Sequence, residues 1–196
     1  MSQCYHIELK TAVNRLVKGE DSVSYPIELS EILPKDEMVA LLREQLKQAG
    51  WKSTNEEETV FETEGPAGET LTISLDSMEL TAALATEKEV EAEASATGRS
   101  EAGTEAARQQ AQRLLKEEAS VLGDQIEDAG TKELQHQIRE QLAESEEARQ
   151  RIMNELLQGV YAESLKRKAG QLGDIMEISE STGEDGNYEL TIRVEQ

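Results

Sequence analysis

The chain has 196 residues, of which 41 are Asp or Glu and 20 are Lys or Arg, so its formal net charge is −21. Hydrophobic residues make up 37% of the chain but aromatic residues only 3%, so a core must be built mainly from Leu, Ile, Val and Ala. This acidity argues against direct nucleic-acid binding through a basic face. No apolar run in the sequence is long enough for a membrane span.

Cysteine content and the first residues bear on the cellular compartment. Cys4 is the single cysteine, which excludes an intramolecular disulfide and a zinc site made of several thiolates. The segment Met1–Lys10 contains no apolar stretch of the kind that a secretory signal requires. Both features predict a cytoplasmic protein.

Near the N-terminus, β-forming residues predict short strands at 4–10 and 22–29, with Pro26 placing the second at an edge or a bulge. A helix is expected over 34–49, because Pro34 suits a first helical turn and Gly50 suits a C-terminal stop. The apolar face of this helix consists of Met38, Leu41, Leu42 and Leu46.

Two β-hairpins are expected from alternating segments that flank Gly-rich turns. The first joins 59–64 to 70–76, and the second joins 174–180 to 188–195 through a turn at 183–187. Each follows the end of a predicted helix and a glycine. This arrangement suggests a repeated helix–glycine–hairpin unit whose strands pair into one sheet, with coincidence as the alternative.

Two further strands are expected at 78–84 and 90–96, although the Ala and Glu of the second also favour helix. The boundary stretch 98–103, rich in small residues, then separates them from a region with helical periodicity.

Two amphipathic helices are predicted, over 104–122 and 132–172, separated by a break at 123–131. They are expected to form a helical hairpin with coiled-coil packing. The predicted fold class is α+β, in which an antiparallel sheet of about six strands packs on the 34–49 helix and the hairpin is inserted between its halves. The corresponding domains are an α+β unit at 1–98, the hairpin at 99–160, and a helix end with a β-hairpin at 161–196.

The acidic residues concentrate outside the helical region. Residues 100–170 carry 10 basic and 14 acidic side chains, whereas the other 125 residues carry 10 basic and 27 acidic ones. The net charges are −4 and −17. The predicted β-rich body is therefore the acidic part.

No residue pattern indicates a catalytic, metal or cofactor site. Cys4 and His6 share a strand face, but nothing around them matches a nucleophile signature, and His136 fits an exposed helix position. Carboxylates are abundant, yet one Trp, one Phe and four Tyr provide little of the aromatic platform that sugar-cleaving carboxylate pairs use.

The long apolar stripe of the helical region and the single tryptophan are candidate partner-binding features. A helix over 104–122 cannot cover the whole of one over 132–172, so the remaining stripe must pack on the body, on a second copy or on another protein. The predicted contact residues are Trp51, Ile138, Leu142, Ile152, Met153 and Leu156. The alternatives are that the stripe is core and that Trp51 plugs the sheet.

The two ends of the chain carry a family resemblance. The ending Leu165-Lys-Arg-Lys-Ala-Gly-Gln-Leu-Gly-Asp-Ile-Met-Glu-Ile followed by Tyr188-Glu-Leu-Thr-Ile-Arg-Val, and the opening Cys4-Tyr-His-Ile-Glu-Leu, are similar to small bacterial and plastid proteins of unknown function. Some of those proteins are accessory members of three-component systems built around an FtsH-like AAA+ ATPase. The resemblance implies a subunit or adaptor role and transfers no site residues.

The leading functional hypothesis is a non-enzymatic cytoplasmic adaptor or structural subunit that binds protein partners, an AAA+ ATPase or a second copy of the chain among them. One alternative is an acidic inhibitor or nucleic-acid mimic that occupies a basic groove. The other is a carboxylate-dependent hydrolase, which would need two close acids in a cleft.

Overall fold

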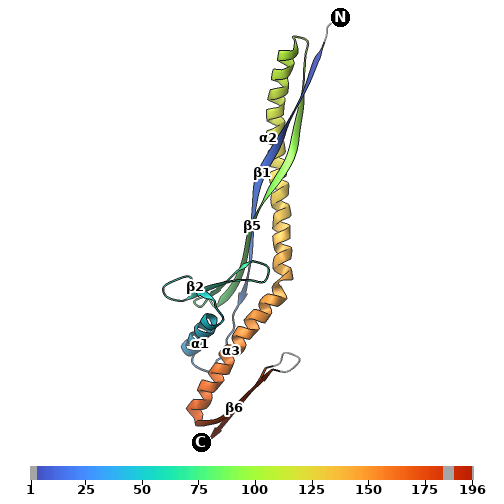
Figure 1. Ribbon diagram of the computed structural model, residues 1–196. Helices are drawn as coiled ribbons and strands as arrows, with labels where there is room; N and C mark the ends of the chain where they lie inside the picture. The colour runs from blue at the N-terminus through green and yellow to red at the C-terminus, as the bar shows by residue number, and fades with distance from the viewer. Residues whose placement is uncertain (1–3, 183–187, 196) are drawn as a thin grey trace. The chain divides into compact units, whose positions relative to one another are not determined.

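The structure, a computed structural model, describes residues 4–182 and 188–195, and the fold in these ranges is α+β (Figure 1). The chain divides into two compact units. Unit 1 comprises residues 1–21 and 85–140, and unit 2 comprises 22–84 and 141–196. The domain division expected from the sequence, at 98 and 160, stays a prediction, and the compact units divide the chain at other positions.

The larger sheet has five strands in the order β1-β5-β4-β3-β2. The β3–β4, β4–β5 and β2–β3 pairs are antiparallel. Lys10 pairs with Glu93 and Lys18 pairs with Glu87, so β1 and β5 also run in opposite directions. The strands are β1 Tyr5–Pro26, β2 Lys52–Ser53, β3 Val60–Glu64, β4 Thr70–Ser74 and β5 Glu79–Ser100.

The four short strands expected at 4–10, 22–29, 78–84 and 90–96 are wrong in their extent, because β1 and β5 are each a single strand of 22 residues. Side chains in β1 alternate between exposed and covered positions along its length. This alternation continues through residues 11–21, between the two expected strands, so a single strand runs from Tyr5 to Pro26.

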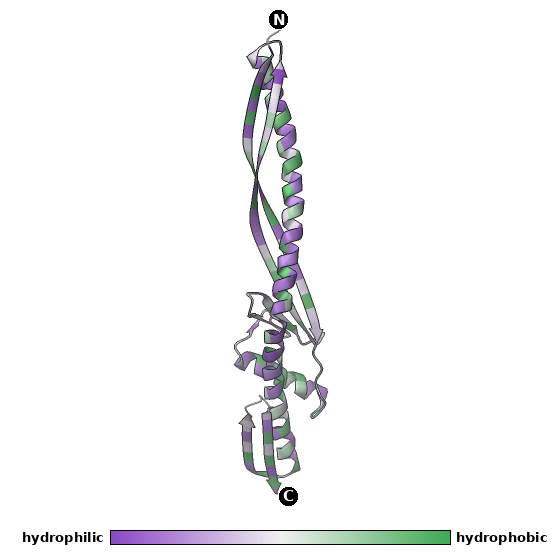
Figure 2. Ribbon diagram, turned by 90° about the vertical axis from the view of Figure 1, so that its right-hand side faces the viewer, coloured by the Kyte–Doolittle hydropathy of each residue, from purple (hydrophilic) through white to green (hydrophobic). Residues whose placement is uncertain are grey.

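Helix α2, Thr104–Glu144, packs on β1 and β5 in unit 1, and Figure 2 shows hydrophobic and hydrophilic residues interleaved along it. The break predicted at 123–131 is wrong. A Cβ added at Gly130 would lie 3.0 Å from a methyl group of Val90 and 3.2 Å from one of Val17. Gly130 therefore permits a close approach of helix to strands, and that packing offsets the roughly 1 kcal/mol that glycine costs inside a helix.

The helical break lies at Ser145, and α3 runs from Glu146 to Leu172. The Ser145 N–H donates to the Gln141 carbonyl at 3.1 Å, and the Arg149 N–H donates to the Ser145 carbonyl at 3.0 Å. Helical hydrogen bonding thus continues through Ser145, whose backbone is itself right-handed helical. The predicted helical hairpin, with its turn at 123–131, is therefore not formed.

In unit 2 the predicted helix near 34–49 is confirmed as α1, Lys35–Gln48. Gly50 has a φ of 83°, its N–H donates to the Lys47 carbonyl, and the Trp51 N–H donates to the Leu46 carbonyl at 3.0 Å. This hydrogen-bonding pattern is a Schellman motif, which glycine favours because the left-handed conformation strains other residues. The motif ends the helix and turns Trp51 back toward it.

The core of unit 2 lies between α1, α3 and the β3–β4 hairpin. Phe61 of β3 is opposite Ile73 of β4, and both are fully buried. Among the described residues of this unit, the other large apolar side chains that are fully enclosed are Met38, Leu41, Leu42, Leu46, Leu71 and Val160. Burial of each large side chain contributes about 1.5–3 kcal/mol.

The C-terminal hairpin is confirmed as β6, Asp174–Thr182, and β7, Tyr188–Glu195. Its predicted turn at 183–187 lies outside the described residues. The two hairpins do not join one sheet, because β6 and β7 form a separate two-stranded sheet. No helix within the described ranges combines the length and the apolar character needed to cross a bilayer.

Candidate functional site

The structure places the six predicted contact residues partly in the interior. Trp51 is 6% exposed, and Ile152 and Met153 are half-buried. The others, Ile138, Leu142 and Leu156, are between 0% and 5% exposed. The exposed stripe expected over the helical region is therefore wrong for the buried members, whose side chains pack within the chain, as the alternative allowed. Whether any of the six binds a partner stays a prediction.

Ile138 illustrates why the stripe is covered. A Cβ added at Gly19 of β1 would lie 2.9 Å from Ile138 Cδ1, so this side chain fills the space that glycine leaves on the strand. Ile138 is thus covered by strand β1 of unit 1 and not by a second helix of a hairpin.

Three of the predicted residues meet in unit 2 at an open groove of about 490 Å³, here called the Trp51 groove. It lies among the end of α1, strand β3 and the middle of α3. Its lining residues are Gln45, Gln48, Ala49, Trp51, Thr63, Glu64, Ile152, Glu155 and Leu156. The volume falls within the range of roughly 300–1,000 Å³ that is typical of ligand pockets.

Close packing of α1 on α3 shapes one side of the Trp51 groove. A Cβ added at Gly159 would lie 2.5 Å from Gln45 Oε1, so the Gln45 side chain lies directly over the α3 backbone. Gly159 does not end α3, which continues to Leu172. This glycine permits a close helix contact beside the groove.

The groove combines an apolar floor with a polar, acidic rim. Trp51, Ile152 and Leu156 provide apolar surface, while the exposed Glu64 and Glu155 provide carboxylates. Among the described residues neither carboxylate forms an ion pair. Ala49 follows the last residue of α1, where the helix dipole adds partial negative charge. The groove is therefore suited to an apolar group that carries a positive charge.

A second feature of unit 2 is a buried ion pair that the sequence analysis missed. Arg149 of α3 is 2% exposed, and its Nη1 donates to Glu69 Oε1 at 3.1 Å, where Glu69 is 0% exposed. Nη1 also donates to the Ser145 hydroxyl. Nη2 donates to the Tyr25 hydroxyl at 3.1 Å and to the Leu142 carbonyl at 2.6 Å. The pair thus links β1, the β3–β4 turn and the break between α2 and α3.

Glu69 holds the β3–β4 turn as well as the arginine. Its Oε2 accepts a hydrogen bond from the Ala67 N–H at 2.7 Å. Burial acts to raise the pKa of Glu69, but hydrogen bonds from the Glu69 and Ala67 backbone N–H groups, Arg149 and Ser145 together hold that pKa below its ordinary value of 4.5. Glu69 is therefore an anion at neutral pH that organises structure.

A small cavity of about 100 Å³ adjoins this ion pair. Arg149 Nε is the one buried side-chain N or O atom without a hydrogen-bond partner in the part of the chain that the structure describes. The lining residues are Tyr25, Pro26, Ile27, Leu80, Glu146, Arg149, Gln150 and Met153. Met153 therefore lies at this cavity and not at the Trp51 groove. A single water could satisfy Nε here, since the space and a polar group are both present.

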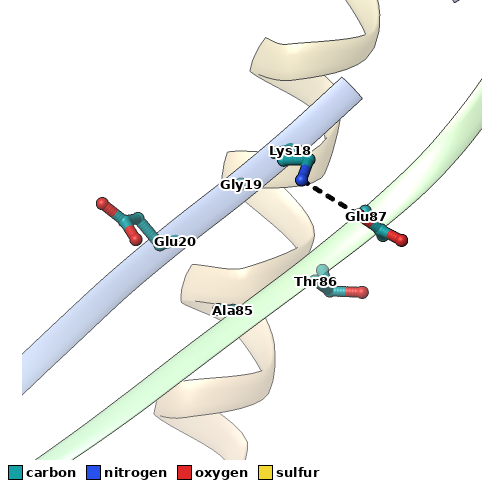
Figure 3. Close-up of a pocket in the computed structure, with 6 residues that line it drawn as sticks. All are labelled: Lys18, Gly19, Glu20, Ala85, Thr86 and Glu87. Carbon is teal, nitrogen blue, oxygen red and sulfur yellow. Dashed lines mark ion pairs between the residues drawn. The ribbon is translucent and has the colours of Figure 1, made fainter. Parts of the chain in front are cut away.

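Unit 1 has a pocket of about 580 Å³ between β1 and β5, shown in Figure 3. Lys18 Nζ reaches Glu87 Oε2 at 3.4 Å across the strands, whereas Glu20 points away from this pair (Figure 3). The Lys18 and Glu87 side chains are 74% and 59% exposed, so their pairing contributes at most about 1 kcal/mol. The polar side chains that line this pocket, those of Lys18, Glu20, Thr86 and Glu87, are exposed and do not form an enclosed binding site.

The cysteine and the two histidines, which were the candidates for nucleophilic or metal chemistry, lie at exposed positions. Cys4 is exposed with a free thiol, and His6 is exposed on the same strand face. His136 Nε2 lies 3.5 Å from Glu140 Oε1 on the surface of α2. Within the described ranges, no group of three or more His, Cys, Asp or Glu side chains is arranged to hold a metal ion.

One signal in the sequence could have identified the buried ion pair. Ser145 and Arg149 interrupt the apolar stripe one helical turn apart, and a charged residue on a buried face requires a partner. The sequence does not indicate which of the 41 acidic residues supplies it. Glu69 lies 80 positions away, in a turn that local patterns treat as solvent-exposed.

A family model described as FtsH ternary system domain X5 matches residues 1–196, the whole chain. No curated protein and no solved structure matches.

Proposed function

The chain belongs to the FtsH ternary system domain X5 family, and from this membership we propose that it is a non-enzymatic accessory subunit, or adaptor, of an assembly built around an FtsH-like AAA+ ATPase. The full-length family match is the observation that carries the proposal, because it covers both compact units. The proposed place of action is the cytoplasm, which agrees with the free, exposed thiol of Cys4.

The layout of unit 2 supports an adaptor role. It presents an open groove with Trp51 in its floor, and tryptophan is enriched among the residues that dominate binding at protein interfaces. Ile152 in the same groove is half-buried and retains surface for a partner. Of the six predicted contact residues, the proposal therefore keeps the three that line the groove, which are Trp51, Ile152 and Leu156.

The experiment is co-elution of the purified full chain with the FtsH-like ATPase from the same organism. Size-exclusion chromatography with light scattering is run at physiological salt, with and without ATP. The proposal predicts a complex heavier than the ATPase alone in at least one nucleotide state. Separate elution in every state would overturn it.

Salt dependence separates the adaptor from the acidic-mimic alternative. Association through a groove with an apolar floor should weaken only modestly as salt rises, because salt screens the charges at the rim but not the apolar burial. A mimic of nucleic acid binds mainly through charge, so its affinity for a basic partner should fall steeply as salt rises.

A further inference from the structure

We infer that the Trp51 groove binds a partner segment in which a single Lys or Arg side chain is flanked by apolar residues. This inference rests on the proposed function and specifies the chemistry of the partner. The occupant is a segment of the partner protein and not a second copy of this chain.

Charge complementarity selects a cation. Glu64 and Glu155 stand on the rim of the groove, from β3 and α3, and within the described residues neither has an ion-pair partner. The C-terminal end of α1 adds the negative end of its dipole at Ala49. An ammonium or guanidinium group at this rim would gain charge-assisted hydrogen bonds that a neutral side chain cannot make.

The surroundings of the groove reinforce this selection over a longer range. Unit 2 contains 25 acidic and 10 basic residues, a net charge of −15, whereas unit 1 has a net charge of −6. A field of one sign concentrates ligands of the opposite sign and accelerates their association. A second copy of the same acidic unit would be repelled, which disfavours self-association through this groove.

The floor selects apolar neighbours for the cation. The groove is lined by Trp51, which follows α1, together with Ile152 and Leu156 of α3. The Trp51 indole N–H has no acceptor among the described residues, and Arg149 Nε is the one enclosed unpaired atom there, so the indole N–H reaches solvent. It can donate to a backbone carbonyl of the bound segment, while the ring packs against the apolar part of a Lys or Arg side chain.

The single tryptophan makes occupancy directly measurable. The full chain is titrated with the peptide Ac-Leu-Arg-Leu-NH2, and Trp51 emission is recorded. The matched probe is the same peptide with citrulline, which keeps the shape of arginine and removes its charge. The inference predicts a saturable change in emission and about tenfold weaker binding of the citrulline peptide, as expected for loss of charge-assisted hydrogen bonds.

Two double variants test the rim. Glu64→Gln with Glu155→Gln should weaken binding of the arginine peptide to the level of the citrulline peptide. The control, Glu56→Gln with Glu147→Gln, removes the same charge from exposed positions of unit 2 outside the groove and should leave the affinity within about twofold. Equal affinity for both peptides, or equal weakening by both double variants, would overturn the inference.

The outcomes remain distinguishable from those of the proposed function. If the rim variant still co-elutes with the ATPase and the arginine peptide does not bind, the adaptor role stands and the groove inference fails. If light scattering instead shows a dimer that the rim variant dissociates, the occupant is a second copy and the inference is wrong.

Discussion

Arg149 and Glu69 form a buried ion pair, with Arg149 Nη1 and Glu69 Oε1 3.1 Å apart and both side chains almost fully enclosed. The pair is 80 positions apart in the chain and ties α3 to the β3–β4 turn. A buried charge without its partner is costly, so the two residues are energetically coupled. Ser145, which also bonds to Arg149, marks the point where α2 gives way to α3.

The first prediction concerns that coupling. Arg149→Met should lower the free energy of unfolding by about 3–5 kcal/mol, because it leaves the Glu69 carboxylate buried without its cation. Glu69→Gln should also destabilise, and the double variant should cost clearly less than the sum of the two. Urea unfolding of the four proteins measures the coupling. If each single variant loses less than about 1 kcal/mol of unfolding free energy, and the two losses add up in the double variant, this account is contradicted.

The second prediction is a pH dependence from Glu69. Its pKa in the folded chain lies below the ordinary value of 4.5, so the unfolded state binds more protons at acidic pH. The stabilisation from Glu69 is therefore complete above pH 4.5 and is lost as the pH falls through the lower, folded pKa. The stability difference between wild type and Glu69→Gln should shrink over this acidic window. A difference that stays constant below pH 4.5 would contradict the assignment.

The third prediction concerns the close packing of α2 in unit 1. A Cβ added at Gly98 would overlap the carbonyl oxygen of Ala107, which is backbone and cannot easily move. Gly98→Ala should therefore destabilise the protein by about 1–3 kcal/mol, although alanine suits strand geometry no worse than glycine. Ser95→Ala, at an exposed position of the same strand, should stay within about 0.5 kcal/mol in the same thermal or urea measurement. Equal stability of both variants would show that the approach is not tight.

The fourth prediction concerns the turn that positions Trp51. Gly50 has a φ of 83°, so Gly50→Ala should cost roughly 1 kcal/mol through backbone strain. Because the Trp51 N–H closes the Schellman motif, the emission of this tryptophan should shift in the variant. Gly170→Ala is the control, since its Cβ would meet only Ile175 Cδ1 at 3.9 Å and alanine favours helix. If Gly50→Ala changes neither the stability nor the Trp51 emission, the role assigned to the turn is contradicted.

The fifth prediction separates core from surface within the predicted contact set. Leu142 is 2% exposed, so Leu142→Glu should unfold the chain or lower its melting temperature strongly. Ile152 is half-buried at the groove, so Ile152→Lys should stay folded and lose the arginine peptide, because it puts a competing cation beside the rim carboxylates. Circular dichroism and Trp51 emission give the two readouts. A folded Leu142→Glu variant would show that this part of the stripe is not core.

The sequence was sufficient for elements whose patterns are local. Lys35–Gln48 and its stop at Gly50 follow from spacing, capping and glycine geometry, and both C-terminal strands follow from alternation. The fold class was likewise predictable, because hairpin and helix patterns were both clear.

The errors came from long-range packing. Gly123 and Gly130 looked like a helix break, but they face the strands of unit 1, where a close approach requires the absence of a side chain. The apolar stripe looked unpartnered because the sequence patterns predicted only short strands at 4–10 and 90–96. The parts of β1 and β5 in unit 1 are continuous and pack on α2. The Trp51 groove assembles from α1, β3 and α3, which no local pattern brings together.

The most direct test of the central claim is site-specific photocrosslinking in the presence of the FtsH-like ATPase. A photoreactive residue replaces Ile152 in the groove or, as the control, Val121, which is 54% exposed on α2. The account predicts that position 152 crosslinks to an ATPase segment containing Lys or Arg between apolar residues, and that position 121 does not. Absence of a crosslink from position 152, or equal crosslinking from both positions, would contradict it.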